Sequence, residues 1–225
     1  MFERLELLIG NDMLDKIKTK NILVVGVGGV GGIVCTSLVR SGIQNITIID
    51  FDKVDISNIN RQEVAYLSTV GEYKTSVLKK MLNDINDKVN VYDLNIYLDE
   101  SNIKDIFDNN NFDYVIDACD SIKTKEAIIM ECLNRNIKFI SSCGTGNRLH
   151  PEKLIITELS KTEGDPIARI LRKWAKDNRI HKKITVLCSL EVPIRKGKVV
   201  ASNSFVPPSA GLLITSYVIN DIICK

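Results

Sequence analysis

The sequence lacks the features that mark secreted, disulfide-bonded or disordered proteins. Its six cysteines include no Cys-x-x-Cys pair, which argues against both a disulfide framework and a structural zinc site. No biased tract is longer than DNNN, and the amino terminus carries acids instead of the basic, apolar and small-residue order of a signal peptide. We therefore expect a folded cytoplasmic protein with reduced thiols.

Long apolar runs are also missing. The most apolar carboxy-terminal segment, AGLLITSYVINDII (210–223), is shorter than the roughly 20 residues of a membrane span and contains Asn220 and Asp221. We expect it to pack on the core as a helix, with no membrane partner. A chain of 225 residues with 44% hydrophobic and 26% charged residues suits one domain with one sizeable core.

Apolar runs and helical patterns alternate along the first two thirds of the chain. The runs NILVVGV (21–27), ITIIDFD (46–52), DYVIDAC (113–119) and IKFISSC (137–143) predict buried strands. Helical patterns lie between or beside them at 30–42, 71–86, 101–109 and 121–136. This order predicts an α/β fold, a Rossmann-like, doubly wound and mostly parallel sheet.

After residue 150 the alternation loosens. Strand patterns at 153–159, 183–189 and 198–204 predict further strands of mixed direction in the same sheet. A helix capped by Asp165, with Pro166 in its first turn, lies between the first two of these strands. A final helix is expected from about Ser209.

A glycine-rich turn after the first strand predicts a nucleotide site. In VVGVGGVGG, Gly26, Gly28 and Gly31 have the G-x-G-x-x-G spacing, with Gly29 inside it. The first glycine allows a tight turn, the second lets the backbone approach phosphate, and the third lets helix and strand pack closely. Asp50 ends the second strand, with Asp52 close behind it, where a carboxylate accepts hydrogen bonds from a ribose. This fits NAD and ATP equally, whereas a Walker P-loop is excluded because no Gly-Lys-Ser/Thr follows the glycines.

Residues that NAD does not require favour ATP. They follow the predicted strands on successive loops, which converge at the carboxyl ends of a doubly wound sheet: Asn58, Arg61 and Gln62 in NINRQ, then Lys74, Asp117 and Asp120. Cations and a carboxylate-held magnesium ion suit the cleavage of a triphosphate. Singly, Lys74 also fits a solvated helix residue and Asp120 a helix cap, so only the joint occurrence favours nucleotidyl transfer.

Five motifs in order, GVGGVG, IIDFD, NINRQ, VGEYK and DACDS, resemble the adenylating domain of the ubiquitin-activating-enzyme-like superfamily, which includes the ThiF, MoeB and HesA proteins. The resemblance implies that Asp50 holds the ATP ribose, that Asn58, Arg61 and Lys74 contact the phosphates, and that Asp120 binds Mg²⁺. The segment FERLELLIG also resembles one whose arginine reaches into a neighbouring subunit's site. It implies a homodimer in which Arg4 acts in trans.

Three longer segments are similar to those of the bacterial tRNA threonylcarbamoyladenosine dehydratases: ERLELLIG, ISSCGTGNRLHPEKLIITELSKTEGDPIARILRK and SFVPPSAGLLITSYVINDI. Such enzymes adenylate the threonyl carboxylate of a modified adenosine in tRNA, and the neighbouring ureido group then closes a ring and expels AMP. The stretch PIRKGKVVAS (193–202) is shorter than the family's pattern, and Cys119 replaces a small or apolar residue.

Basic charge is concentrated in the second half. Residues 161–198 hold 11 Lys and Arg against four Asp and Glu. On the helix after Asp165, an apolar face of Ile167, Ile170, Leu171 and Trp174 is predicted to pack on the core, opposite Arg169, Arg172, Lys173 and Lys176. Such a face is either a solvated helix surface or a site for tRNA phosphates.

Three functions remain open at this point. The first is the ATP-dependent cyclisation of a tRNA nucleoside, and the second is the adenylation of a small sulfur-carrier or ubiquitin-like protein, with a possible sulfur-transfer partner. The third is a nucleotide-binding scaffold without chemistry. Cys188 lies in an apolar strand pattern, which favours a buried structural thiol over a nucleophile. We expect a single adenylating domain over 1–225, made of a helical segment (1–20), a nucleotide-binding core (21–150) and a substrate-side extension with the last helix (151–225).

Overall fold

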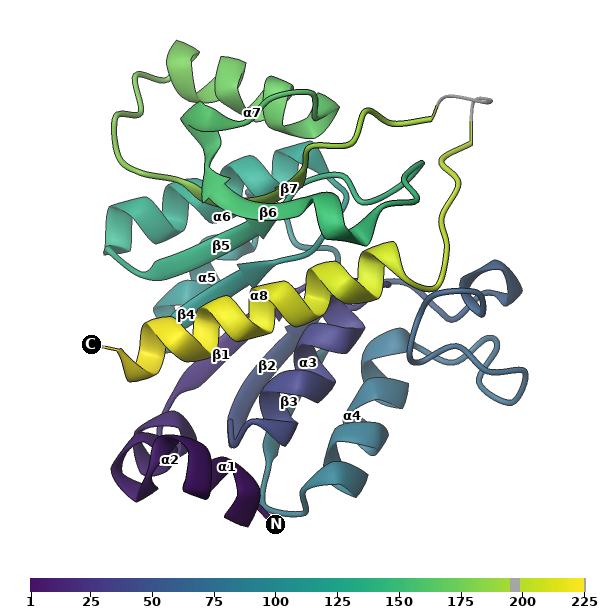
Figure 1. Cartoon of the computed structure of the whole chain (residues 1–225), viewed down its shortest axis with the longest axis vertical. Helices are drawn as coiled ribbons and strands as arrows, with labels where there is room; N and C mark the ends of the chain where they lie inside the picture. Colours follow the sequence, from purple (N-terminus) through teal and green to yellow (C-terminus); the bar gives the residue numbers. More distant parts are fainter. Residues whose placement is uncertain (195–198, 225) are drawn as a thin grey trace.

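The computed structural model describes residues 1–194 and 199–224 and contains one seven-stranded sheet. The spatial order is β3-β2-β1-β4-β5-β7-β6, in which β6 and β7 pair antiparallel and every other pair is parallel. The predicted Rossmann-like fold is confirmed, including a mixed-direction strand in the second half (Figure 1). The strands are β1 (Asn21–Val25), β2 (Asn45–Ile49), β3 (Asn90–Leu94), β4 (Tyr114–Asp117), β5 (Lys138–Ser142), β6 (Leu154–Glu158) and β7 (Thr185–Ser189).

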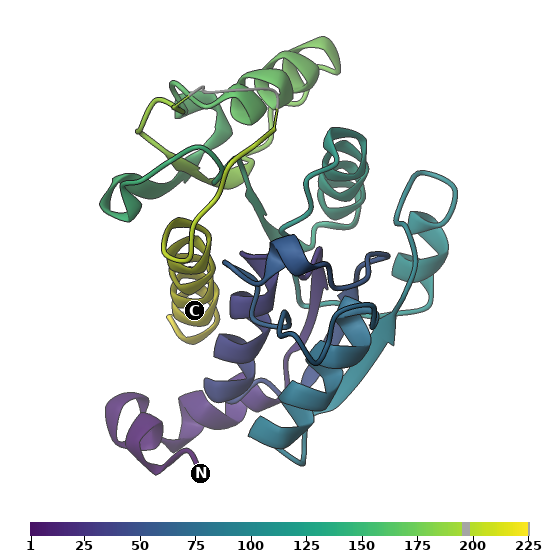
Figure 2. The ribbon, with the colours of Figure 1, turned by 90° about the vertical axis from the view of Figure 1, so that its right-hand side faces the viewer.

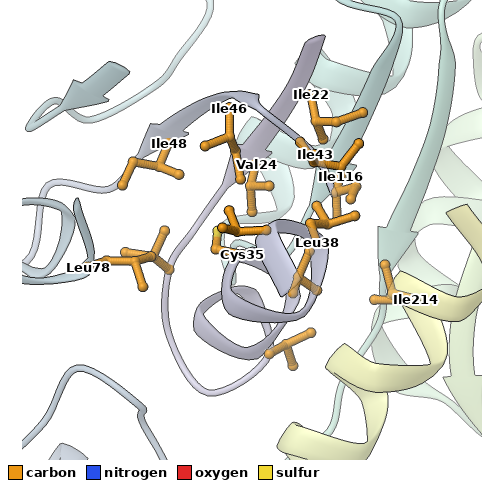
Figure 3. Close-up of a cluster of buried hydrophobic side chains, with 14 of the residues drawn as sticks. Ile22, Val24, Cys35, Leu38, Ile43, Ile46, Ile48, Leu78, Ile116 and Ile214 are labelled. Carbon is orange, nitrogen blue, oxygen red and sulfur yellow. The ribbon is translucent and has the colours of Figure 1, made fainter. Parts of the chain in front are cut away.

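Helices cover both faces of the sheet because successive strand residues point to opposite sides. Ile22 and Val24 join one buried cluster, with α3, α4 and α8, while Leu23 and Val25 join the other, with α5, α6 and α7. Figure 2 shows α8 and α6 on opposite sides of the sheet, and Figure 3 shows the first cluster around α3. The helices are α1 (Glu3–Ile9), α2 (Asn11–Lys18), α3 (Gly31–Arg40), α4 (Lys74–Ile85), α5 (Ile103–Asp108), α6 (Ile122–Arg135), α7 (Pro166–Asp177) and α8 (Val206–Ile223).

The structure differs from the predicted elements in three places. The sequence pattern missed β3, an edge strand whose exposed Tyr92 interrupts the apolar run that marks a buried strand. Residues 199–204 form no strand, and Lys198, the first residue of that prediction, lies outside the described residues. The last helix starts at Val206 instead of Ser209, because Asn203 Oδ1 accepts hydrogen bonds from the Phe205 and Val206 amides.

The start of α7 is as predicted, and Ile167, Leu171 and Trp174 pack on the core as predicted, but Ile170 does not. Asp165 accepts hydrogen bonds from the Ile167 and Ala168 amides at 2.9 and 3.0 Å and so caps the helix. The buried positions are Ala168, Leu171 and Ala175, whereas Ile170 is 45% exposed. The core face is therefore centred on Leu171, and small alanines occupy positions that the search for large apolar residues passed over.

Helix α8 packs against α3. At Gly211 a Cβ atom would lie 2.7 Å from the Val30 carbonyl oxygen, so the absence of a side chain is what allows this close approach. Among the described residues, α8 is also the single helix whose length and hydropathy would suffice to cross a membrane. Its face towards α3 is buried in the core, as expected for the carboxy-terminal apolar run.

Candidate active site

A cavity of about 630 Å³ opens at the carboxyl ends of the parallel strands. This is the edge at which doubly wound sheets bind ligands. Loops after four strands supply its walls: Gly26, Gly28 and Gly29 after β1, Asp50 to Asp52 after β2, Ile96 to Leu98 after β3, and Cys119 to Ser121 after β4. A further wall follows β5 and reaches α7 and the start of α8.

The first and third glycines of the glycine-rich turn have the structural roles that their spacing predicts. Gly26 has φ +83°, and a Cβ atom there would lie 2.8 Å from the Ala118 backbone. A Cβ atom at Gly31 would lie 1.8 Å from the Gly26 carbonyl oxygen. Gly28, in contrast, faces open space, since a Cβ atom there would have the Gln62 side chain as its nearest neighbour, at 3.8 Å. The turn therefore presents bare backbone to the cavity at Gly28, beside the amino terminus of α3.

Asp50 is held in place by backbone amides. Its two carboxylate oxygens accept hydrogen bonds from Val27 N at 2.8 Å and Asp52 N at 2.9 Å. Burial raises the pKa of Asp50, and the two amides and the Lys74 charge oppose that rise. Each carboxylate oxygen keeps a lone pair, so Asp50 still has the acceptor capacity that a ribose diol needs.

Lys74 is the first residue of α4 and is nearly buried, with 5% exposure. Its Nζ lies 2.7 Å from Asp52 Oδ2, and its amide donates to the Asp52 carbonyl at 3.0 Å. The alternative of a solvated helix residue was therefore wrong. The ammonium group thus lines the cavity at the amino terminus of α4, paired with Asp52.

The NINRQ stretch contributes three lining side chains. Asn58 Oδ1 accepts from Asp55 N in a capping box at a short 3₁₀ turn (Ile56–Asn58), which fixes the loop. Arg61 Nη1 donates to Ser57 O and Asn60 Oδ1 at 2.9 and 2.8 Å, which leaves its other guanidinium donors available. Gln62 Oε1 is buried without a hydrogen-bond partner among the described residues.

Asp117 and Asp120 have different environments, although both were predicted to face phosphates. The prediction for Asp117 was wrong: its carboxylate is fully buried below the cavity and ion-paired with Lys125 Nζ at 3.0 Å. Asp120 lines the cavity, is exposed, and has no hydrogen-bond or ion-pair partner within the described residues. The cap of α6 is Ser121, not Asp120, so the capping alternative for Asp120 was also wrong.

A single open carboxylate fits Mg²⁺, which takes one or two protein carboxylates and completes its shell with phosphate and water oxygens. The described residues contain no cluster of three His, Cys, Asp or Glu that would form a complete protein cage. Asp120 can therefore hold a magnesium ion only together with ligand oxygens.

Sequence reasoning missed two parts of the cavity. Phe51 and Tyr97 form an edge-to-face aromatic pair with centroids 5.0 Å apart, and both side chains line the cavity. Tyr97 follows β3, so missing that strand also hid this residue. The second part is an uncharged wall of Ser142, Cys143, Gly144, Thr145, Gly146, Ile167, Val200, Ser202 and Pro207.

Two asparagines hold that uncharged wall together. Asn147 Oδ1 accepts from Ala201 N at 2.8 Å, and Asn60 Nδ2 donates to Ser202 O at 3.1 Å. Because Asn60 belongs to the NINRQ stretch, the second contact joins that stretch to the uncharged wall. No regular periodicity marks these loop contacts in the sequence.

The basic face on α7 is smaller than predicted. Arg169, Lys173 and Lys176 are exposed, but Arg172 turns inward and donates to the Thr162 carbonyl at 2.6 Å and to the Thr162 hydroxyl. The prediction that Arg172 faces RNA was wrong, because its guanidinium group donates hydrogen bonds to Thr162 in the loop before the helix. Ile167 lines the cavity, so the remaining face starts within one turn of it. Arg195, Lys196 and Lys198 of the basic segment lie outside the described residues.

Two other predicted residues lie away from the cavity. Cys188 is 1% exposed, and burial raises the pKa of its thiol to about 11, in agreement with a structural role. Arg4 lies on α1 and is not among the described residues that line the cavity. Helix α1 has no buried residue, and Leu7 and Leu8 on it are 88% and 80% exposed.

Comparisons with known proteins identify similar chains. A tRNA threonylcarbamoyladenosine dehydratase of Bacillus subtilis (strain 168) is 39% identical, over 99% of this chain and 94% of its own length. The enzyme of that name from Haemophilus influenzae is 38% identical over 72% of this chain and 61% of its own length. A crystal structure of the E. coli enzyme, TcdA, in complex with ATP is 30% identical, has a TM-score of 0.94, and covers 100% of this chain and 94% of the other. A ThiF family profile matches residues 2–167, and the chain therefore belongs to the ThiF family.

Proposed function

We propose that this protein uses ATP to cyclise threonylcarbamoyladenosine in tRNA, with net loss of one water. The observation that carries the proposal is one cavity that gathers Gly28, Asp50, Arg61, Lys74 and Asp120 together with the uncharged wall. The charged residues suit a triphosphate. The names of the similar dehydratases indicate the second substrate, threonylcarbamoyladenosine in tRNA.

ATP would lie with its ribose on Asp50 and its phosphates over Gly28 and Gly29. Asn58, Gln62, Arg61 and Lys74 would contact the phosphates, and the pair Phe51 and Tyr97 offers aromatic surface for the adenine. Asp120 would hold Mg²⁺ with phosphate oxygens, and the ion would neutralise charge on the leaving pyrophosphate.

The reaction would proceed in two steps. The threonyl carboxylate attacks the α-phosphorus of ATP and pyrophosphate leaves, while Arg61 and Lys74 stabilise the charge on the phosphates. The ureido group of the nucleoside then attacks the activated carbonyl, loses a proton and expels AMP. The oxygen lost from the carboxylate leaves in AMP. No enzyme nucleophile is required, which agrees with the burial of Cys188.

One assay tests this function. The protein is incubated with ATP, Mg²⁺ and either tRNA that contains threonylcarbamoyladenosine or a small carrier protein, and AMP, pyrophosphate exchange and nucleoside mass are measured. We expect AMP release and loss of one water from the nucleoside. Carrier-dependent pyrophosphate exchange with an unchanged nucleoside would instead support the adenylation of a carrier protein. If neither substrate is turned over, the result would support a nucleotide-binding scaffold without chemistry. We also propose that the protein acts in the cytoplasm, because its proposed substrate is tRNA.

The face of Arg169, Lys173 and Lys176 is proposed to bind tRNA phosphates. Changing all three to Glu should raise the KM for tRNA about 10-fold or more at low salt and reduce its salt dependence, because phosphate contacts release counterions. The KM for ATP should stay constant. A matched triple change of Lys79, Lys80 and Lys88, at the other end of the sheet, is the control. Equal tRNA KM values in the two variants would contradict an RNA face on α7.

We also propose a homodimer in which Arg4 completes the partner's site. The exposed Leu7 and Leu8 on α1 support this arrangement. A second copy of the chain would bury these apolar side chains, which α1 leaves open to solvent. Arg4→Ala should lower turnover about 10²-fold or more without changing the melting temperature. Mixing it with an inactive Asp120→Asn variant should restore part of the activity through hybrid dimers. Proven subunit exchange without restored activity would count against a shared site.

A further inference from the structure

A fully buried ion pair lies beneath the cavity and takes no part in the proposed reaction. Lys125 and Asp117 both have 0% side-chain exposure, and Lys125 Nζ lies 3.1 and 3.0 Å from the two Asp117 carboxylate oxygens. Ser141 Oγ donates a further hydrogen bond to Asp117. Every charged atom of the pair has partners, so the pair is a built element of the cavity floor.

The pair joins three elements that carry cavity residues. Asp117 ends β4, Lys125 lies on α6, and Lys125 Nζ also donates to the Ser142 carbonyl at the end of β5 at 2.7 Å. Asp117 Oδ1 additionally accepts from Cys119 N at 3.2 Å and Cys119 Sγ at 3.1 Å. The turn 118–121, which carries Asp120, is thus attached at Cys119 to the buried charge.

The same turn supports the phosphate loop. A Cβ atom at Gly26 would lie 2.8 Å from the Ala118 carbonyl carbon and from Cys119 Cα, so the two backbones are in direct contact. Gly26 N also donates to the Ile49 carbonyl of β2 at 2.8 Å, so the phosphate loop has a second support that does not involve turn 118–121. Loss of the ion pair would therefore move Asp120 relative to the phosphate loop.

A net gain in stability does not explain such a pair. Removing two charges from water costs about as much as their attraction returns, and apolar residues of similar volume usually serve a core equally well. Ile128 and Ile129, on the same helix as Lys125, are buried in the hydrophobic core. Burial acts to lower the pKa of Lys125, but the Asp117 carboxylate outweighs it and the pKa is raised, so the lysine keeps its charge.

We propose that Lys125 is a positioning residue that acts through Asp117 to hold Asp120 at the phosphate site. The inference rests on the proposed role of Asp120 in holding Mg²⁺, and it assigns to Asp117 a task other than the ligand contact expected from the sequence. Residues that orient a metal ligand without touching the metal commonly change metal affinity about 10–100-fold when they are replaced.

The test is the double variant Asp117→Asn/Lys125→Met, which removes both charges and keeps the volume similar. ATP binding is measured by calorimetry in EDTA and across a Mg²⁺ titration. We expect ATP affinity in EDTA to change less than about 2-fold, and the Mg²⁺ concentration for half-maximal enhancement of ATP binding to rise about 10-fold or more. The matched control is Asp113→Asn/Lys20→Met, which removes the ion pair before the other end of β4, where the two atoms lie 2.8 Å apart.

A folded double variant with wild-type Mg²⁺ dependence would overturn the proposal, as would a wild type whose ATP binding ignores Mg²⁺. If the double variant does not fold, Ser141→Ala takes its place, because it removes one Asp117 partner without exposing a charge. It should raise the half-maximal Mg²⁺ concentration about 2–3-fold, and no change would again overturn the inference. Binding of ATP is measured without tRNA, so failure of the tRNA assay would be distinguishable from failure here.

Discussion

Arg61→Ala is expected to lower kcat about 10²–10³-fold, the usual effect of removing one charged or hydrogen-bonding group that stabilises a transition state. In the free protein the guanidinium is held by Ser57 O and Asn60 Oδ1, at the edge of the cavity. Negative charge grows on the bridging oxygen as pyrophosphate leaves, so the loss should appear mainly in kcat and less in the KM for ATP. Steady-state kinetics with tRNA substrate measure both.

Arg61→Lys is the informative control. Lysine keeps the charge but not the planar fork of donors, so it should restore only a small part of the rate. The melting temperature of both variants should stay within a few degrees of wild type, because Arg61 is partly exposed and lies outside the core. A kcat within about 3-fold of wild type in Arg61→Ala would mean that another group neutralises the leaving phosphate.

The central sheet and the phosphate loop could be predicted because each depends on short-range rules. Four apolar runs predicted β1, β2, β4 and β5 in the positions where the structure has them, and glycine spacing predicted the turn. The edge strand β3 escaped because one of its faces is open to solvent, and with it Tyr97 was missed. The prediction missed β3 and Tyr97 for the same physical reason: a half-exposed strand lacks the continuous apolar run that marks a buried strand.

The errors at the site arise from contacts between distant residues. Asp117 and Asp120 lie three positions apart in DACDS, and the sequence does not distinguish their environments. Lys125 and Ser141 bind Asp117 in the core, whereas Asp120 lines the cavity. Arg172 likewise turns towards Thr162, ten residues before it. The sequence shows which charged residues are present, but the packing of the fold determines which of them contact one another.

The second large effect is expected at the phosphate loop, where two glycines should respond differently to the same added methyl group. Gly31→Ala should destabilise the protein by about 3 kcal/mol or more, since its Cβ atom would lie 1.8 Å from the Gly26 carbonyl oxygen and only backbone movement can relieve that contact. For a chain of this length the melting temperature should fall by about 6–12 °C. Thermal unfolding without ligand measures this.

Gly28→Ala is the counterpart, since open space surrounds its Cβ position and the Gln62 side chain is 3.8 Å away. The fold should tolerate the methyl group, with a melting temperature within about 2 °C of wild type. The group would project into the space where phosphate approaches the backbone, so ATP affinity should fall about 10-fold or more, a loss of about 1.4 kcal/mol. Equal ATP affinity in Gly28→Ala and wild type would place the triphosphate elsewhere in the cavity. The two variants therefore separate what the G-x-G-x-x-G spacing combines, since one glycine serves the packing of strand against helix and the other serves the ligand.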